Sequence, residues 1–174
     1  MTVEPTSAGP RVEIRSEQPC VAISVTTTPS EWGGVGTLVI EALEWLAARG
    51  LTPAGAPFLR HRLVGDGGRP FRLEIGWPVE APVEGAGRVV AGVIPAGRYA
   101  VLVHAGHPDR LPESCKALEL WGADRGLEWD VHRDGAEEVW GGRFEFYLTD
   151  PAERPDPEEW LTEIAYRVRD EPAG

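Results

Sequence analysis

Sulfur and positive charge are scarce in this sequence. The 174 residues include two cysteines and one methionine, and 17 basic residues stand against 28 acidic ones, giving a net charge of −11. Cys20 and Cys115 lie far apart without metal-ligand spacing, which predicts two reduced, buried thiols. The four histidines are scattered, so neither a metal site nor a Ser-His-Asp arrangement can be assembled, and no cofactor is expected. A nucleic-acid groove needs positive potential, so the acidic balance argues against a nucleic-acid partner.

Long hydrophobic runs are also missing. Arg, Glu or Gly interrupts each apolar stretch well short of the length that spans a membrane, so no membrane partner is expected. Residues 1–13 have neither the basic start nor the apolar centre of a signal peptide, which predicts a cytoplasmic protein. With 42% hydrophobic and 26% charged residues, the chain has the size and composition of one domain or two small fused halves.

Periodicity divides the chain into two similar series of elements. The first is a strand at 20–28, a helix within 28–50, and strands at 56–64 and 69–80. A linker at 81–88 follows. The second series has strands at 89–97 and 98–106, a helix within 107–126, two strands from "LEWDVH" and "VWGGRFEFYL", and a short helical turn leading to a closing strand within 156–169. Residues 1–17 are expected to be a tail or edge segment, with a possible strand at 12–14, and 170–174 a C-terminal tail.

The two series resemble each other in sequence. "EALEWLAARGL" (41–51) matches "KALELWGADRGL" (116–127), and "FRLEIG" (71–76) matches "GRFEFY" (142–147), which aligns Glu74 with Glu145. We therefore predict an α+β fold of duplicated β-α-β-β units, with repeats at about 18–80 and 89–169. Two antiparallel sheets would lie side by side as one pseudo-symmetric layer, with the helices on one face and a ligand groove between the repeats.

The strand at 143–148 alternates two kinds of side chain. Phe144, Phe146 and Leu148 form one set, and Arg143, Glu145 and Tyr147 form the other. If the first set faces the helices, Glu145 and Tyr147 face the groove, and Glu74 points the same way as Glu145. A Glu in the middle of a strand is also explained by plain solvent exposure.

Five segments, taken in order, resemble the GyrI-like small-molecule-binding domain. They are "LAARGLTPAGAPFLRHR", "LEIGWPVE", "IPAGRYAVLVHAGHPDRL", "FEFYLTDPAE" and "WLTEIAYRVR", and the resemblance runs from about residue 18 to 169. That domain also forms the effector-binding half of multidrug-responsive transcription regulators. The resemblance implies a deep groove for bulky, flat, hydrophobic and often cationic compounds, with the acidic residue of the "E-x-Y-L" strand, here Glu145, in the cavity. Because no helix-turn-helix segment precedes the domain, a stand-alone member is expected.

Seven tryptophans are an excess for this length. Trp45 and Trp121 lie in matched helices and are assigned to the core, and Trp160 to the C-terminal turn. The candidate ligand-binding residues are Glu145, Tyr147, Trp140, Trp77, Trp32 and Glu74. Each of the three candidate indoles is also explained by ordinary packing, since a buried indole needs only a partner for its N–H group.

Three functions stay open at this stage. The first is multidrug binding, in which aromatic walls supply affinity and Glu145 supplies the preference for cations. The second is a hydrolase that opens cyclopropane rings of DNA-alkylating natural products, with Glu145 as general base or electrostatic stabiliser and Tyr147 as proton donor. The third, which follows the family name, is contact with DNA gyrase that restrains it.

Overall fold

The computed structural model describes residues 9–28, 35–65, 70–135 and 137–169. The strands are β1 (Arg11–Arg15), β2 (Gln18–Thr27), β3 (Phe58–Val64), β4 (Phe71–Pro78), β5 (Val89–Ile94), β6 (Gly97–Ala105), β7 (Val131–Asp134), β8 (Glu137–Trp140), β9 (Arg143–Tyr147) and β10 (Leu161–Val168). The helices are α1 (Val35–Ala47) and α2 (Leu111–Asp124), with short 3₁₀ helices η2 (Pro108–Arg110) and η3 (Pro157–Glu159). No helix in these described segments is long and apolar enough to cross a membrane.

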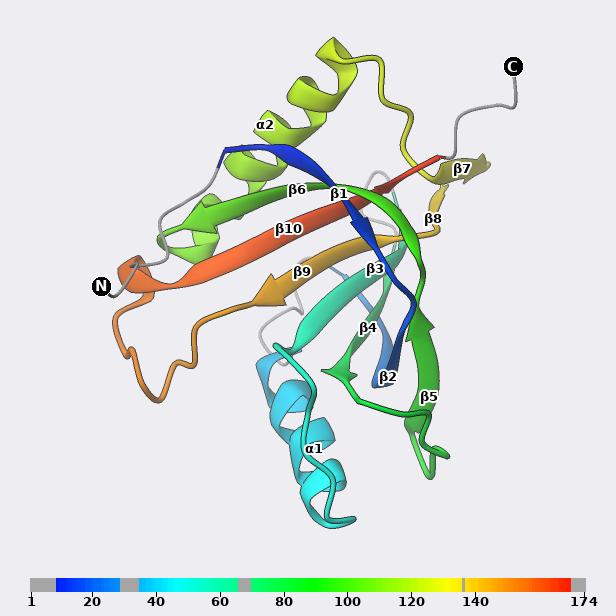
Figure 1. The fold of residues 1–174 in the computed structure, drawn as a ribbon, viewed down its shortest axis with the longest axis vertical. Coiled ribbons are helices and arrows are strands. Elements are labelled where there is room, and N and C mark those ends of the chain that lie inside the picture. The colour runs from blue at the N-terminus through cyan, green and yellow to red at the C-terminus, as the bar shows by residue number, and fades with distance from the viewer. Residues whose placement is uncertain (1–8, 29–34, 66–69, 136, 170–174) are drawn as a thin grey trace.

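The described strands form one curled antiparallel sheet in the order β1-β6-β10-β9-β3-β4-β2-β5, with the β7–β8 hairpin attached to β3 (Figure 1). In the structure the two β-α-β-β units are β2-α1-β3-β4 and β6-α2-β9-β10. They meet where β3 pairs with β9, so the two sheets are continuous. The α+β fold with duplicated units is confirmed, and we call the β3–β9 pair the seam.

The edge strands exchange places between the two units. β1 precedes β2 in the chain but pairs with β6, and β5 precedes β6 but pairs with β2. The possible strand at 12–14 is confirmed as part of β1. Because each edge strand belongs to one unit and completes the sheet of the other, the two units share their hydrogen bonding across the whole domain.

The helices bear out the alignment of the two halves. The Arg49 guanidinium lies 3.7 Å from the centre of the Trp45 ring in α1, and Arg125 lies 4.2 Å from Trp121 in α2. In both pairs the Arg comes four residues after the Trp and lies just beyond the end of the helix. The strand alignment is wrong, however. β4 takes the place in its unit that β10 takes in the other, so Glu74 is not the positional partner of Glu145.

The predicted strand "VWGGRFEFYL" is divided into β8 and β9 at Gly141 and Gly142. A Cβ at Gly141 would lie 1.9 Å from the Asp130 carboxylate, and a Cβ at Gly142 would lie 2.8 Å from the Arg167 side chain. The two glycines therefore let the chain pass close to its neighbours while β8 leaves to pair with β3 and β7.

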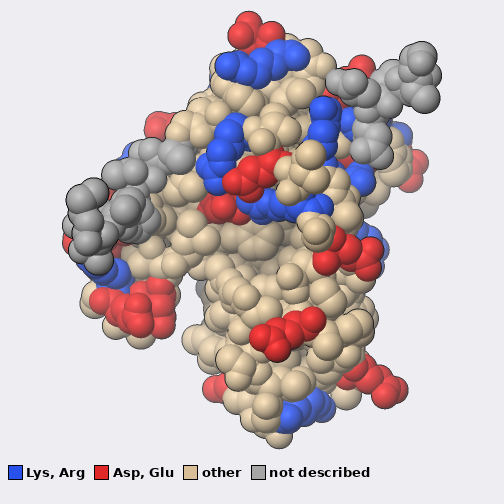
Figure 2. Space-filling view, in the orientation of Figure 1, with Lys and Arg blue, Asp and Glu red and all other residues tan. Residues whose placement is uncertain are grey.

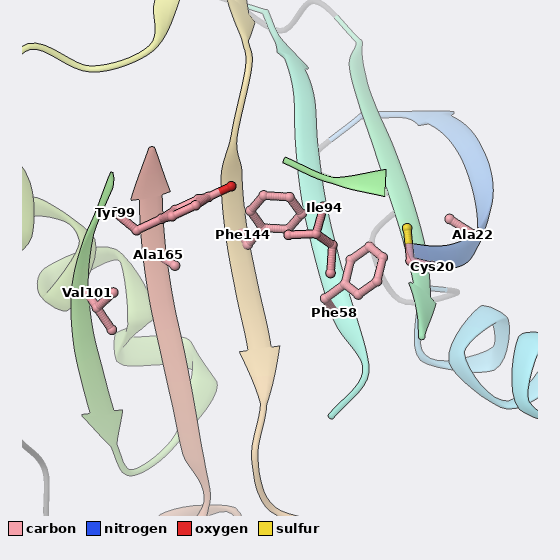
Figure 3. Close-up of a cluster of buried hydrophobic side chains, with 8 residues drawn as sticks. All are labelled: Cys20, Ala22, Phe58, Ile94, Tyr99, Val101, Phe144 and Ala165. Atoms are coloured by element: carbon pink, nitrogen blue, oxygen red, sulfur yellow. The ribbon is translucent and has the colours of Figure 1, made fainter. Parts of the chain in front are cut away.

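Both faces of the sheet are buried. On the face that carries no helix, a cluster contains Phe58, Phe144, Tyr99 and Ile94, with Ile94 at the end of β5 lying between the two phenylalanine rings (Figure 3). On the other face, one cluster joins β6 and β10 to α2, and two more join β2, β3 and β4 to α1. Apolar residues therefore mark both sides of the central strands.

Gly122 in α2 gives a test of helix packing. An alanine Cβ there would lie 2.5 Å from the Trp129 ring, which is itself held edge-on against Tyr166 at 5.5 Å. Overpacking costs about 1–3 kcal/mol, while the better helix propensity of alanine returns about 1 kcal/mol. We expect Gly122→Ala to lower the free energy of unfolding by about 1 kcal/mol in urea denaturation. Gly36→Ala is the control, because a Cβ at Gly36 in α1 meets nothing within 4 Å. Equal stabilisation by both alanines would contradict this packing.

Candidate functional site

Glu145 interrupts a row of apolar residues that crosses six strands. In register, the row is Leu102, Ile164, Glu145, Leu59, Ile75 and Ile23. Residues paired directly across antiparallel strands point to the same face. The Leu102–Ile164 end packs with α2 and the Ile75–Ile23 end packs with α1. Glu145 therefore lies at the seam on the helix-bearing face, and it is only 9% exposed.

The two helices pack on either side of the seam. The main contacts of α1 are with β4 and β2, and the main contacts of α2 with the sheet are with β6. The two middle strands, β3 and β9, thus lie between the strands that the helices cover. In the space-filling view a notch separates the loop after β9 from the lobe that carries α1 (Figures 1 and 2). The seam is where the sequence predicts a groove between the repeats, and that groove stays a prediction.

The predicted orientation of β9 is wrong. Phe144 and Phe146 belong to the cluster on the helix-free face, while Tyr147 packs against Leu59 and its neighbours under α1. The expectation that the phenylalanines face the helices assumed that one face of the sheet is wet. Because both faces are buried, alternation shows which residues share a face but not which face carries the helices.

Glu74 lies on the face opposite to Glu145. It is paired with Arg60, and Arg60 is paired with Phe144, so the three side chains point to the helix-free face. The Arg60 Nη1 atom lies 3.8 Å from the Glu74 carboxylate, and its guanidinium lies 5.1 Å from the Phe144 ring. The prediction that Glu74 and Glu145 share one groove is therefore wrong, since each carboxylate belongs to a different side of the sheet.

His61 is a candidate site residue that was not predicted from the sequence. Its Nε2 atom lies 3.0 Å from Oε2 of Glu145, and it is 7% exposed. The two residues are 84 positions apart in the chain, so no local motif joins them. The register of β3 on β9 brings them together, and neither β-propensity nor alternation gives that register. The pair links the two repeats across the seam.

Burial sets the protonation of the groups around Glu145. It lowers the pKa of the His61 imidazole below its ordinary value, and the hydrogen bond with Glu145 opposes this change. Burial, followed by repulsion from the Glu145 carboxylate, raises the pKa of the Tyr147 phenol well above its ordinary value. Near neutral pH Tyr147 therefore keeps its proton and offers an uncharged hydrogen-bond donor on the same face as Glu145.

The candidate tryptophans are held by other partners. Trp140 is 4% exposed, its ring lies 5.4 Å from Tyr166, and Arg143 lies 4.9 Å from both rings. The Trp77 indole N–H donates to the Val39 carbonyl of α1 at 2.9 Å. These contacts give both indoles a packing role. Trp32 lies outside the described residues. Of the predicted residues that the structure describes, Glu145, Tyr147, Trp77 and Trp140 lie on the helix-bearing face, and Tyr147 is the one that lies beside Glu145 on β9.

A hollow lies on the helix-free face. It has a volume of about 440 Å³ and is lined by Phe146, Ile94, Arg15 and Glu163 among others. Arg15 bonds Glu163 at 2.7 Å and Glu13 at 2.8 Å, so the charges at its edge are already paired. Figure 2, which has β1 toward the viewer, shows acidic and basic side chains mixed over this region.

Within the described segments no group of three or more His, Cys, Asp or Glu residues could hold a metal ion.

Comparisons with known proteins agree with this fold. A model of the family described as the GyrI-like small molecule binding domain matches residues 10–169. A comparison with curated proteins gave no match. The EcmrR C-terminal domain superposes with a TM-score of 0.72 at 19% identity, covering 92% of this chain and 97% of that one. EcmrR in its DNA complex gives a TM-score of 0.77 at 18% identity over 92% of this chain, which spans 57% of the length of that protein.

Two further solved structures share the fold at low identity. SAV2435 bound to tetraphenylphosphonium has a TM-score of 0.58 at 12% identity, covering 93% of this chain and 94% of that one. A hydrolase from Listeria innocua has a TM-score of 0.61 at 14% identity, covering 92% of both chains. At these identities the likeness shows the fold alone.

Proposed function

The chain belongs to the GyrI-like small-molecule-binding family, and on this premise we propose that it binds bulky, flat, hydrophobic cations at Glu145. The observation that carries the proposal is the place of this carboxylate. It is a charged group buried in the middle of an apolar row, on the face between the two helices. Leu59, Ile164 and the half-buried Tyr147 supply apolar and aromatic surface beside it.

The charge preference follows from desolvation. A buried carboxylate loses hydration, and an arriving positive charge compensates for that loss. A cation whose charge is spread over aromatic groups gives up little hydration of its own, so it enters an apolar site at a smaller cost than an ammonium ion. The aromatic ring of Tyr147 adds a cation–π contribution of about 0.5–2 kcal/mol. The charge of Glu145 and its apolar surroundings thus favour one class of ligand.

The relatives support the bulky, hydrophobic and cationic character of the proposed ligand. SAV2435 was solved with tetraphenylphosphonium, which is a bulky aromatic cation. Its fold covers nearly the whole of this chain. EcmrR was also solved in complex with DNA, and the present chain spans 57% of the length of that protein.

Two ions of the same shape test the proposal. Tetraphenylphosphonium and tetraphenylborate have four phenyl groups each and carry opposite charges. Isothermal titration at pH 7.5, with quenching of tryptophan fluorescence as a second signal, should show binding of the phosphonium at least about tenfold tighter than the borate. Equal affinities, or tighter binding of the borate, would contradict a site selected by a carboxylate.

A hydrolase is the second candidate function. The observation that favours it is the set of groups at the seam: the Glu145 carboxylate, His61 at 3.0 Å from it, and the protonated phenol of Tyr147. Such groups can activate water and donate a proton. Incubation with a cyclopropane-bearing alkylating compound, followed by mass spectrometry, tests it. Turnover that Glu145→Gln abolishes while binding persists would support an enzyme, and an unchanged compound would exclude this reaction. Contact with DNA gyrase stays a prediction from the sequence.

A further inference from the structure

We propose that His61 sets the net charge of the Glu145 site, so that the site prefers cations when the imidazole is neutral and loses that preference when it is protonated. This inference rests on the proposed function, because it concerns the regulation of the same site. His61 of the first repeat then determines the charge specificity of the site through its contact with Glu145 of the second repeat.

The geometry gives His61 this position. Its Nε2 atom lies 3.0 Å from one oxygen of Glu145, Oε2, and the side chains of His61 and Glu145 are only 9% and 12% exposed. A neutral imidazole with its proton on Nε2 donates to the carboxylate and leaves the pair with a charge of −1. A protonated imidazole makes the same hydrogen bond and brings the pair to zero. The contact is kept in both states, while the charge that a ligand meets changes.

One other buried histidine shares this face. His104 of β6 lies in register with Thr162 and Tyr147, and its Nδ1 atom lies 2.6 Å from the Ser114 hydroxyl of α2. The remaining charged and titratable residues beside the pair are Arg143 and Tyr147 on β9, Tyr166 on β10 and Cys115 on α2, and the residue of β4 opposite His61 is the apolar Leu73. Burial raises the pKa of Cys115, Tyr147 and Tyr166, so these three stay uncharged. Arg143 stays positive, and its nearness adds to the lowering of the His61 pKa that burial begins.

The expected direction follows from linkage. Because burial lowers the His61 pKa, the imidazole is neutral at pH 7.5 and takes up its proton only below its ordinary range near pH 6.5. A bound cation opposes that protonation, so by reciprocity protonation weakens cation binding. Tetraphenylphosphonium has no titratable group, which leaves the protein as the source of any pH dependence.

The test is the affinity for tetraphenylphosphonium measured by titration calorimetry from pH 7.5 to pH 5. We expect the wild-type affinity to fall by about tenfold or more while the affinity for tetraphenylborate rises. His61→Gln keeps an amide donor for Glu145 but cannot take up a proton, so its affinity should vary with pH by less than about threefold. His132→Gln, which replaces an exposed histidine of β7, should keep the wild-type profile. A flat wild-type profile, or a His61→Gln variant with the wild-type profile, overturns the inference.

A readout without ligand separates this inference from the proposed function. Nuclear magnetic resonance of the four imidazoles, with His61 assigned by its loss in His61→Gln, follows the protonation of His61 directly. We expect His61 to titrate below its ordinary range and to titrate still lower in Glu145→Gln, because the carboxylate that favours its proton is gone. If tetraphenylphosphonium binds at no pH, the proposed function fails by itself. If His61 takes up no proton down to pH 5, or titrates identically in Glu145→Gln, the inference fails.

Discussion

Replacing Glu145 by glutamine is expected to lower the affinity for tetraphenylphosphonium by about 30-fold at pH 7.5, which corresponds to about 2 kcal/mol. The substitution removes the buried charge and little else. Glutamine has nearly the same volume, and its side-chain oxygen still accepts a hydrogen bond from His61 at the place of Oε2. The loss should therefore appear for cations alone, with the affinity for tetraphenylborate unchanged or improved. Titration calorimetry measures both.

Glu74→Gln is the matched control for this prediction. Glu74 lies on the helix-free face, where its carboxylate contacts Arg60 and Arg62. Its removal should change the phosphonium affinity by less than about threefold, since the sheet separates it from the site. If the two glutamine variants weaken phosphonium binding equally, the charge preference comes from the overall acidity of the protein and not from a carboxylate at the seam.

Replacing the neighbouring Phe144 by alanine is expected to cause a large loss of stability, whereas Glu145→Gln is expected to change ligand affinity. Phe144 is fully buried on the helix-free face, and its ring lies 5.8 Å from Phe58 and 5.5 Å from Phe146. Removing a buried phenylalanine ring and leaving a cavity costs about 3–5 kcal/mol. For a domain of this size that loss lowers the melting temperature by about 10 °C. Differential scanning calorimetry is the direct measurement.

A conservative variant of Phe144 separates the effect on stability from the effect on ligand binding. Phe144→Leu keeps much of the apolar volume and should cost about half as much as the alanine variant. It should also keep the phosphonium affinity within about threefold of wild type at 20 °C, because Phe144 and Glu145 point to opposite faces. A Phe144→Ala variant as stable as wild type would mean that the helix-free face is not packed as described.

The α+β class, the two helices and the positions of most strands could be predicted from the sequence because each depends on local periodicity and on the end signals of each element. Gly50 and Gly126, with φ near 70°, end matched helices, and each follows a Trp–Arg pair four residues apart. The continuity of the sheet could not be predicted, since pairing of β3 with β9 joins residues far apart in the chain. The alignment of Glu74 with Glu145 failed for the same reason. Two strands with similar sequences need not occupy equivalent places in the sheet.

The candidate site was predicted in part. Alternation and the family resemblance picked out Glu145 and Tyr147, which the structure places on one face beside the seam. His61 could not be predicted, because its partner Glu145 is 84 residues away and a single histidine in a strand forms no recognisable sequence motif. Trp77 and Trp140 were favoured by their places near strand ends. A place near a strand end does not show whether an indole faces a groove or, as here, packs against Val39 or Tyr166.

The central claim is that a cation binds at the seam beside Glu145, on the helix-bearing face. Tetraphenylarsonium has the shape and charge of the phosphonium, and its arsenic atom scatters anomalously. A crystal structure of the complex should show one anomalous peak between α1 and α2, next to the Glu145 carboxylate. A peak in the hollow lined by Phe146, Arg15 and Glu163 on the opposite face would contradict the claim.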